Sequence, residues 1–180
     1  MSKLLVISGS SGVGKGTVIN EFLKRHIEFK LSISCTTRNK RDGEENGINY
    51  FFLSRKEFNK CIENHEFLEW AEFSGNFYGT KKSFVEKCLE RGENLILEID
   101  TKGALNVKKI MPEATLIFIA PPSFEELEAR LRGRHTETEE AIQKRLASIK
   151  LELENSKRYD YVVVNDTVDN AVKAIEKIAL

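Results

Sequence analysis

The sequence predicts an α/β fold of three layers, in which helices cover both faces of a central parallel sheet. Short, continuous apolar runs recur along the chain, helical patterns separate them, and a glycine-rich loop directly follows the first run. Strands that alternate with helices are joined by βαβ crossovers, which give a parallel sheet. Continuous apolar runs are typical of strands covered on both faces. The runs are Leu4–Ile7, Leu95–Ile99, Thr115–Ile119 and Tyr161–Val164.

Helical patterns lie between and after these runs. The first is expected over about Gly16–Arg25. The second starts near Thr80 and stops before Gly92, a residue suited to the left-handed position that follows a helix. The third begins at Ser123, where Ser-Phe-Glu-Glu is typical of a capping box, and the last covers about Val168–Leu180.

Residues 34–80 interrupt this alternation and predict a small mixed α/β insert on the main sheet. Strands are expected at Ile48–Leu53 and Phe67–Phe73. A short helix between them is expected to begin with a capping box formed by Ser54 and Glu57.

We expect a single domain, which suits a chain of 180 residues. Its core is expected to comprise about 1–33, 81–123 and 151–180, with the insert at about 34–80. Residues 124–150 are strongly charged and helical, with a loop in the middle, and predict a mobile helical lid.

The composition excludes several classes of function. The 28 basic and 28 acidic residues balance, so the chain has no broad field for nucleic acid or an anionic membrane, and neither is expected as a partner. Cys35, Cys61 and Cys88 form no CxxC pair, which indicates free thiols in a reducing cytoplasm rather than zinc or disulfides. The apolar run Leu4–Ile7 is too short for a signal peptide or membrane span.

The strongest motif is the segment GSSGVGKGT, which follows an apolar strand and precedes a helix. Glycines let the backbone curl so that successive N–H groups face a phosphate, and the helix N-terminus adds its positive dipole end. Lys15 can reach the β- and γ-phosphates, although Gly16 stands where Ser or Thr is usual, with Thr17 next. The alternative is a glycine-rich turn without a ligand. The predicted ATP contacts are Gly9, Ser10, Ser11, Gly12, Val13, Gly14, Lys15, Gly16 and Thr17.

The loop that follows the expected insert boundary carries Arg38 and Arg41. Guanidinium groups bind a terminal phosphate dianion in a bidentate way, and Tyr50 and Tyr78 can donate phenolic hydrogen bonds to the same oxygens. Acidic residues are interleaved in this loop, so spacing alone favours the alternative of a solvated charged loop.

The chain resembles the guanylate kinase family over essentially its whole length. The stretches that carry this resemblance are SGSSGVGKGT, SISCTTRNKRDGEENGINYFF, FLEWAEFSGNFYGT, LILEIDTKGA, LEARLRGRHTET, IQKRL and YDYVVVND. Their number and order together are highly specific. The resemblance implies a P-loop NTPase fold with a GMP-binding insert and a helical lid.

The resemblance also implies which residues bind GMP. In the family the insert holds GMP, and the matching residues here for the phosphate are Arg38, Arg41, Tyr50 and Tyr78. Those around the guanine are Ser34, Glu69, Gly79, Thr80 and Asp100.

The chemistry of guanine fits a carboxylate at Glu69. Guanine presents two adjacent donors, N1–H and the 2-amino group, and one carboxylate can accept from both, whereas adenine turns a bare N1 acceptor toward it. Hydrogen bonds to a charged group contribute about 1.5–3 kcal/mol each, and a site built on them can reject a poor analogue by about 10⁴–10⁵. The alternative for Glu69 is an exposed strand residue beside Trp70.

Glu98 and Asp100 lie at the end of an apolar strand, where the carboxyl ends of parallel strands border the ligand crevice. Thr17 and Asp100 are the predicted contacts for a Mg²⁺ ion that arrives with ATP. A helix N-cap role is an equal alternative for Asp100. Lys102 departs from the glutamine of the family pattern, which puts one family contact in doubt.

The resemblance assigns the lid arginines Arg130, Arg134 and Arg145 to the transferring phosphoryl group. An arginine in that role is worth about 10³–10⁵ in rate. The alternative is surface arginines paired with nearby glutamates. His135 stands where the family usually has glycine, and we expect it at the surface.

The expected function is MgATP-dependent phosphorylation of GMP, and of dGMP, to the diphosphate in purine nucleotide metabolism and salvage. Lys15, Arg38, Arg41 and the three lid arginines are the predicted catalytic residues, and Asn165 is expected to border the adenine. We expect a cytoplasmic monomer or small homo-oligomer whose partners are ATP and GMP. Two alternatives are a non-catalytic phosphopeptide-binding module of the same fold and a P-loop kinase for another nucleoside monophosphate.

Overall fold

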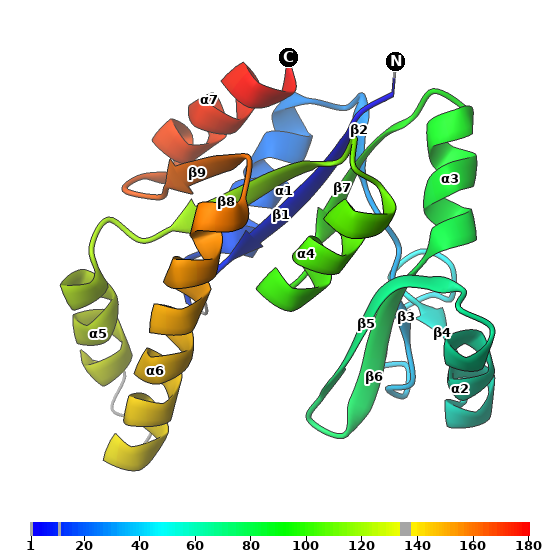
Figure 1. Cartoon of the computed structure of the whole chain (residues 1–180), viewed down its shortest axis with the longest axis horizontal. Helices are drawn as coiled ribbons and strands as arrows, with labels where there is room; N and C mark the ends of the chain where they lie inside the picture. The colour runs from blue at the N-terminus through cyan, green and yellow to red at the C-terminus, as the bar shows by residue number, and fades with distance from the viewer. Residues whose placement is uncertain (1, 11, 134–137) are drawn as a thin grey trace.

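The computed structural model describes residues 2–10, 12–133 and 138–180, and its centre is a five-stranded parallel sheet (Figure 1). The strand order is β2-β7-β1-β8-β9. This arrangement confirms the predicted central parallel sheet. The strands are β1 (Leu4–Gly9), β2 (Phe29–Leu31), β7 (Asn94–Glu98), β8 (Thr115–Ala120) and β9 (Tyr161–Val164).

Two layers of helices cover this sheet, and β1 shows why its sequence is apolar without interruption. Leu5 and Ile7 pack into the core on one face, whereas Leu4 and Val6 pack into the core on the other. All four are at most 4% exposed, because successive side chains of a strand point to opposite faces. The helices are α1 (Lys15–Arg25) and α7 (Val168–Ala179) on the first face, and α3 (Lys82–Glu90) and α4 (Thr101–Ile110) on the second.

The prediction that every apolar run is covered on both faces is wrong for β9. This strand lies at the edge of the sheet, where it pairs with β8. Tyr161, Val162 and Val164 are about half exposed, and only Val163 is buried among the four. Four apolar residues in a row therefore indicate a strand of this sheet without showing that both faces are covered.

A second, four-stranded sheet with the order β4-β3-β6-β5 is formed by the segment between β2 and α3. The strand Phe67–Phe73 and the capping box of Ser54 and Glu57 are confirmed. The strand expected over Ile48–Leu53 is only two residues long, because residues 45–49 form a turn closed by hydrogen bonds of Ile48 N and Asn49 N to Glu45 O. The elements are β3 (Cys35–Thr36), β4 (Phe51–Phe52), α2 (Arg55–Glu63), β5 (Phe67–Phe73) and β6 (Asn76–Lys81).

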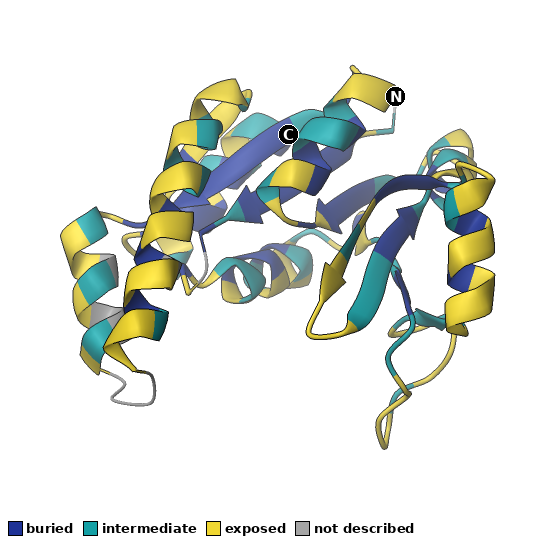
Figure 2. Cartoon of the chain, turned by 60° about the horizontal axis from the view of Figure 1, so that its bottom comes forward, coloured by how far each residue is buried: buried dark blue, intermediate teal, exposed yellow. Residues whose placement is uncertain are grey.

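The helices α5 (Phe124–Gly133) and α6 (Glu139–Asn155), with the 3₁₀ turn η1 (Ser156–Arg158), lie at the opposite end of the molecule from the second sheet (Figures 1 and 2). The hydroxyl of Ser123 accepts a hydrogen bond from the Glu126 amide at 3.0 Å, as expected for a helix that begins there. The helices α5 and α6 share a small separate core, which contains Ile142, Leu146, Ile149, Phe124 and Leu153.

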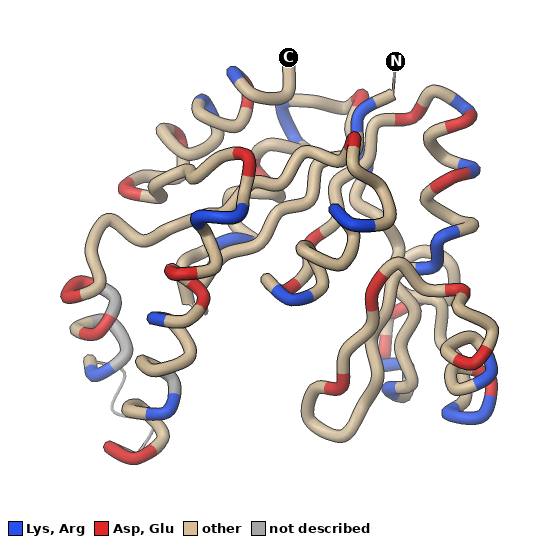
Figure 3. The backbone as a smooth tube through the Cα atoms, viewed as in Figure 1, with Lys and Arg blue, Asp and Glu red and all other residues tan. Residues whose placement is uncertain are grey.

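Basic and acidic residues are interspersed along the trace, which agrees with the balanced composition (Figure 3). Over residues 2–10, 12–133 and 138–180, no helix combines the length and the apolar character that a membrane crossing requires.

His26, the C-cap of α1, contacts Glu28, Glu176 of α7 and the core residue Phe22 through its imidazole. Its Nδ1 lies 3.1 Å from Glu28 Oε1, and its Nε2 lies 2.9 Å from Glu176 Oε1 on α7. The ring also contacts Phe22, with 4.6 Å between ring centroids. The hydrogen bond to Glu176 is the main cause that raises the pKa of His26 above 6.5.

We expect the free energy of unfolding to decrease as pH rises through the raised pKa of His26. The stabilisation by protonated His26 is complete below the unfolded pKa of 6.5, and it is lost above the folded pKa because the neutral ring no longer forms ion pairs. Its size is about 1 kcal/mol or less, as for ion pairs near a protein surface. Denaturant melts from pH 5.5 to 8.5 should show a difference between wild type and His26→Gln that shrinks with pH; a constant difference would contradict the assignment.

Candidate active site

The loop between β1 and α1 turns its backbone inward in the way a phosphate site requires. Gly12 and Gly14 have φ angles of 82° and 87°, a left-handed conformation that side chains rarely allow. Gly14 is the N-cap of α1 and has no side chain to cap the helix, so the first amides of α1 face outward from its N-terminus. Together the curled loop and the helix end suit an anion.

Lys15, the first residue of α1, reaches from this loop toward the end of β7. Its ammonium lies 3.9 Å from Glu98 Oε1 and 3.5 Å from the carbonyl oxygen of Ile99. The side chain of Lys15 is 21% exposed, so the charge is sheltered but reachable. The same Glu98 carboxylate would lie 3.7 Å from a Cβ atom on Gly16, which places it beside the phosphate loop.

Asn165, which directly follows the edge strand β9, fixes the phosphate loop. Its Nδ2 donates to the carbonyl oxygen of Val13 at 2.7 Å, and its backbone amide donates to Ala120 at the end of β8. The Val13 side chain is buried in the core, so Val13 can face a phosphate only with its main chain. Asn165 Oδ1 is buried and has no hydrogen-bond partner in the part of the chain that the structure describes.

A cavity of about 490 Å³ joins the phosphate loop to the second sheet. It brings together seven of the residues predicted from the sequence, and its whole lining includes residues of both sheets. Arg38, Arg41 and Thr80 do not line it. The lining residues are Lys15, Ser34, Tyr50, Glu69, Ala71, Phe73, Tyr78, Gly79, Glu98, Ile99 and Asp100.

Glu69 is buried rather than exposed, because β5 has an irregular register with β6 at this point. Phe67 pairs with Lys81 while Glu69 pairs with Thr80, so one extra residue of β5 lies between the pairs and adjacent residues Leu68 and Glu69 are both buried. The hydroxyl of Thr80, itself 1% exposed, donates to Glu69 Oε1 at 2.6 Å. Thr80 therefore acts on the site through Glu69.

Burial, together with the nearby carboxylate of Asp100, raises the pKa of Glu69 to about 7, against the opposing hydrogen bonds from Thr80. A buried carboxyl group with a raised pKa is only partly ionised near pH 7. A ligand that supplies hydrogen-bond donors stabilises its ionised form. Two adjacent N–H donors on one edge of a base meet that requirement.

Asp100 is the N-cap of α4, so the alternative considered for it from the sequence is confirmed. Its Oδ1 accepts a hydrogen bond from the Gly103 amide at 2.6 Å. The hydroxyl of Ser8 donates to the carbonyl oxygens of Ile99 and Asp100 at 2.9 and 3.2 Å, which fixes the strand end. The cap does not remove Asp100 from the cavity, since the residue also lines it.

Arg38 lies beside the cavity and is held by several neighbours. Its Nη2 donates to Glu44 Oε1 at 2.7 Å, and its guanidinium carbon lies 5.5 Å from the centroid of the Tyr50 ring. The rings of Tyr50 and Tyr78, both of which line the cavity, are 6.1 Å apart. Arg41 is exposed in the same loop.

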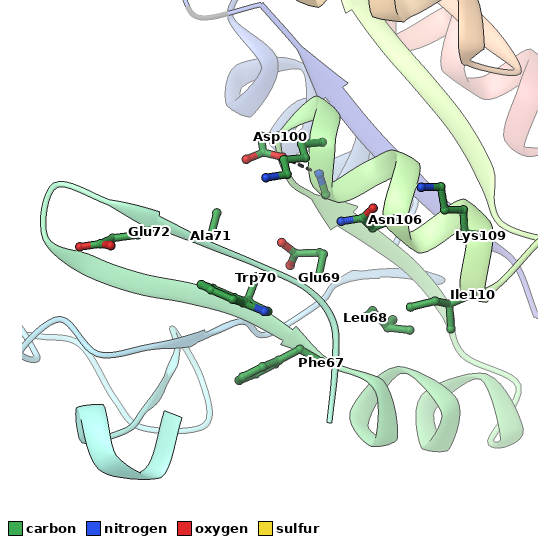
Figure 4. A pocket seen from close by; sticks show the side chains of 12 residues that line it. Phe67, Leu68, Glu69, Trp70, Ala71, Glu72, Asp100, Asn106, Lys109 and Ile110 are labelled. Carbon is green, nitrogen blue, oxygen red and sulfur yellow. Dashed lines mark hydrogen bonds between the residues drawn. The ribbon is translucent and has the colours of Figure 1, made fainter. Parts of the chain in front are cut away.

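A second cavity, of about 610 Å³, adjoins the first and shares Glu69, Ala71 and Asp100 with it. It extends between β5 and α4 toward Asn106, Lys109 and Ile110 (Figure 4). Lys102, which departs from the family pattern, lines this cavity and not the first one.

The side chains of four predicted site residues lie outside the part of the chain that the structure describes. Ser11 and Arg134 lie outside the described residues. Arg130 and Arg145 belong to α5 and α6, but their side chains are also outside the description. His135 likewise lies outside it.

Sequence reasoning placed Glu98 at the border of the ligand crevice without giving it a role, and it did not assign Glu44 to the site. Glu98 was recognisable as a carboxylate at the carboxyl end of a parallel strand, a position that borders ligand crevices. Glu44 had no local signal, because its contact with Arg38 depends on how residues 39–43 turn.

Comparison with known proteins agrees with this geometry. A sequence model of the family "Guanylate kinase" matches residues 1–179. A guanylate kinase of Bacillus anthracis is 51% identical over 98% of this chain and 87% of that protein. One of Prochlorococcus marinus is 49% identical over 98% and 95%. The crystal structure of guanylate kinase from Anaplasma phagocytophilum, 34% identical, aligns with a TM-score of 0.75 over 98% of this chain and 84% of that one, which confirms the predicted P-loop NTPase fold. The chain belongs to the guanylate kinase family.

Proposed function

We propose that the protein transfers the γ-phosphoryl group of ATP to GMP, and to dGMP, with ADP and GDP or dGDP as products. The observation that carries this proposal is one cavity that contains both Lys15 of the phosphate loop and the buried carboxylate of Glu69. A triphosphate on the loop and a purine at Glu69 would place donor and acceptor end to end. Family membership supports the same reaction.

On the acceptor side, Glu69 accepts hydrogen bonds from N1–H and the 2-amino group of guanine, while Ser34, Gly79 and Asp100 line the rest of the base site. The phosphate lies toward Arg38, Arg41, Tyr50 and Tyr78. Because the attacking atom is an anionic phosphate oxygen rather than a hydroxyl, no general base is required.

On the donor side, the loop amides and Lys15 hold the β- and γ-phosphates of ATP. Asn165 donates to the carbonyl oxygen of Val13 and so fixes the loop that would hold these phosphates, and we expect it to border the adenine.

The residues at this end of the cavity fit Mg²⁺. The described residues include no group of three or more His, Cys, Asp or Glu side chains that could hold a metal alone, and Mg²⁺ is typically held by one or two carboxylates together with substrate phosphates. Glu98 lies beside the phosphate loop, Thr17 follows Gly16, and Asp100 lines the same cavity. The ion would neutralise charge on the phosphates.

We further propose that residues 34–80 act as an acceptor-binding insert and 124–150 as a lid that carries Arg130, Arg134 and Arg145. The positions of α5 and α6 and of the second sheet, at opposite ends of the core, support closure from two sides (Figure 1). Closure excludes water and so prevents wasteful hydrolysis of ATP.

A panel of nucleoside monophosphates tests the reaction. ADP release should depend on GMP or dGMP, with kcat/KM for AMP, CMP and UMP lower by orders of magnitude. AMP, CMP or UMP outperforming GMP would refute the acceptor assignment and would indicate a P-loop kinase of another specificity.

We expect KM for GMP to fall as pH rises through about 7, the pKa to which burial raises Glu69. Only the ionised carboxylate can accept both guanine hydrogen bonds, so acidic pH weakens GMP binding. Initial rates should be measured from pH 6 to 8.5 at saturating ATP. Glu69→Gln corrects for ionisation of the GMP phosphate, whose pKa is about 6, because that titration is common to both proteins; identical pH profiles would contradict the role of Glu69.

A further inference from the structure

We propose that Glu44 is a positioning residue for the acceptor phosphate, because its carboxylate holds Arg38 and the main chain of Arg41 in one fixed arrangement. The inference rests on the proposed function, in which Arg38 and Arg41 bind the phosphate of GMP. It extends that function to a residue that touches neither nucleotide.

The two oxygens of the Glu44 carboxylate have separate partners. Oε1 accepts from Arg38 Nη2 at 2.7 Å, and Oε2 accepts from the backbone amide of Arg41 at 2.8 Å. The carbonyl oxygen of Arg41 in turn accepts from the Glu44 amide at 3.2 Å. A single side chain thus closes residues 41–44 into a turn and ties that turn to Arg38.

Arg38 is held from other directions as well. Its Nη1 donates to the carbonyl oxygen of Asn39 at 2.7 Å, and its guanidinium carbon lies 5.5 and 5.9 Å from the ring centroids of Tyr50 and Phe52. The ion pair is sheltered, with side-chain exposures of 15% for Arg38 and 18% for Glu44. Two of the five N–H donors of arginine are accounted for by these bonds, which leaves others for a phosphate.

Side-chain to backbone hydrogen bonds also form in the rest of this loop. Asn49 Oδ1 accepts from the Glu45 amide at 2.8 Å, and Asn46 Oδ1 accepts from the Phe52 amide at 2.9 Å. Side-chain oxygens therefore accept from backbone amides of this loop in place of a regular ladder. A rigid loop of this kind suits positioning better than capture by flexible charges.

Glu44 has two opposing effects on phosphate binding. Its negative charge opposes that of the phosphate, which by itself would weaken binding. Its hydrogen bonds fix a long side chain in advance and so remove the ordering cost, which is about 0.5–1.5 kcal/mol for each rotamer-rich side chain. Because Arg38 and the Arg41 main chain are both fixed, and the charge is already shared within a close pair, we infer that the positioning effect is larger.

The test compares two loop variants that each remove one negative charge. Glu44→Gln should raise KM for GMP about 10-fold with little change in kcat or in KM for ATP. Glu45→Gln is the matched control, because Glu45 is exposed and lies next in the same loop. It should leave KM for GMP at or below the wild-type value. An equal decrease in KM for both variants would show that only charge matters and would overturn the proposal.

Binding of guanosine separates positioning from general damage to the fold. By calorimetry, Glu44→Gln should weaken GMP binding about 10-fold and leave guanosine binding unchanged, since guanosine lacks the phosphate. Equal weakening of both would overturn the proposal. Glu44→Asp keeps the charge but is too short to reach both donors, so it should raise KM for GMP as Glu44→Gln does. A wild-type protein that prefers another monophosphate to GMP would instead refute the proposed function itself.

Discussion

Lys15→Met is expected to lower kcat by about 10²–10³-fold, the loss typical when one preorganised donor to developing charge is removed. The Lys15 ammonium extends from the phosphate loop into the cavity, where it lies 3.9 Å from Glu98. In the proposed reaction it stabilises negative charge on the β- and γ-phosphates, and methionine keeps the length of the side chain without the charge. The measurement is GMP-dependent ADP release at saturating ATP and GMP.

The matched control for this change is Lys24→Met on the same helix. The Lys24 side chain is 75% exposed and pairs only loosely with Glu21, at 3.6 Å. Its replacement should leave kcat within twofold of wild type. If Lys15→Met kept more than a tenth of the wild-type kcat, Lys15 would not have the proposed role. A wild-type protein without measurable affinity for MgATP would instead favour the non-catalytic binding module.

Glu69→Gln is expected to lower kcat/KM for GMP by about 10²–10⁴-fold. Two hydrogen bonds from guanine to a carboxylate are lost or weakened, at about 1.5–3 kcal/mol each, and about 1.4 kcal/mol corresponds to a tenfold change. The variant should also discriminate less between GMP and AMP, since glutamine can donate to the bare N1 of adenine. Initial rates with both acceptors measure the two effects together.

Glu72→Gln provides the comparison on the same strand. Glu72 follows Glu69 by three residues on β5, but its side chain is 54% exposed and it lies 3.7 Å from Arg55. Its replacement should leave the GMP-to-AMP preference unchanged. A change of less than tenfold in kcat/KM for GMP with Glu69→Gln would remove Glu69 from base recognition.

The parts of this protein that could be predicted from sequence are those determined by short segments. The phosphate loop is a local motif between a strand and a helix, and the strand Phe67–Phe73 and the Ser54 capping box are likewise local patterns. The paired strands Cys35–Thr36 and Asn76–Lys81 were not predicted, because their hydrogen bonds join segments distant in sequence. β9 shows the same limit, since its place at the sheet edge is a property of the whole topology.

The chemistry of the site depends even more on long-range packing. In the sequence, Glu69 has the pattern of an ordinary charged strand residue. Its burial results from the irregular pairing of β5 with β6 and from the approach of α4. The hydrogen bond of Asn165 to Val13 joins residues 152 positions apart, so no local pattern could predict it. The resemblance to a family supplied candidate residues, whereas their burial and contacts required the fold.

The cavity that joins the phosphate loop to the second sheet is lined by residues of both sheets, and this has a mechanical consequence. Glu69 and Tyr78 belong to the smaller sheet, whereas Glu98 belongs to the larger one and Asp100 caps the helix behind it. A purine nucleotide bound in this cavity would contact residues on both sides and so connect the two sheets reversibly. Binding of GMP at the proposed site is therefore expected to restrain the relative motion of the two sheets.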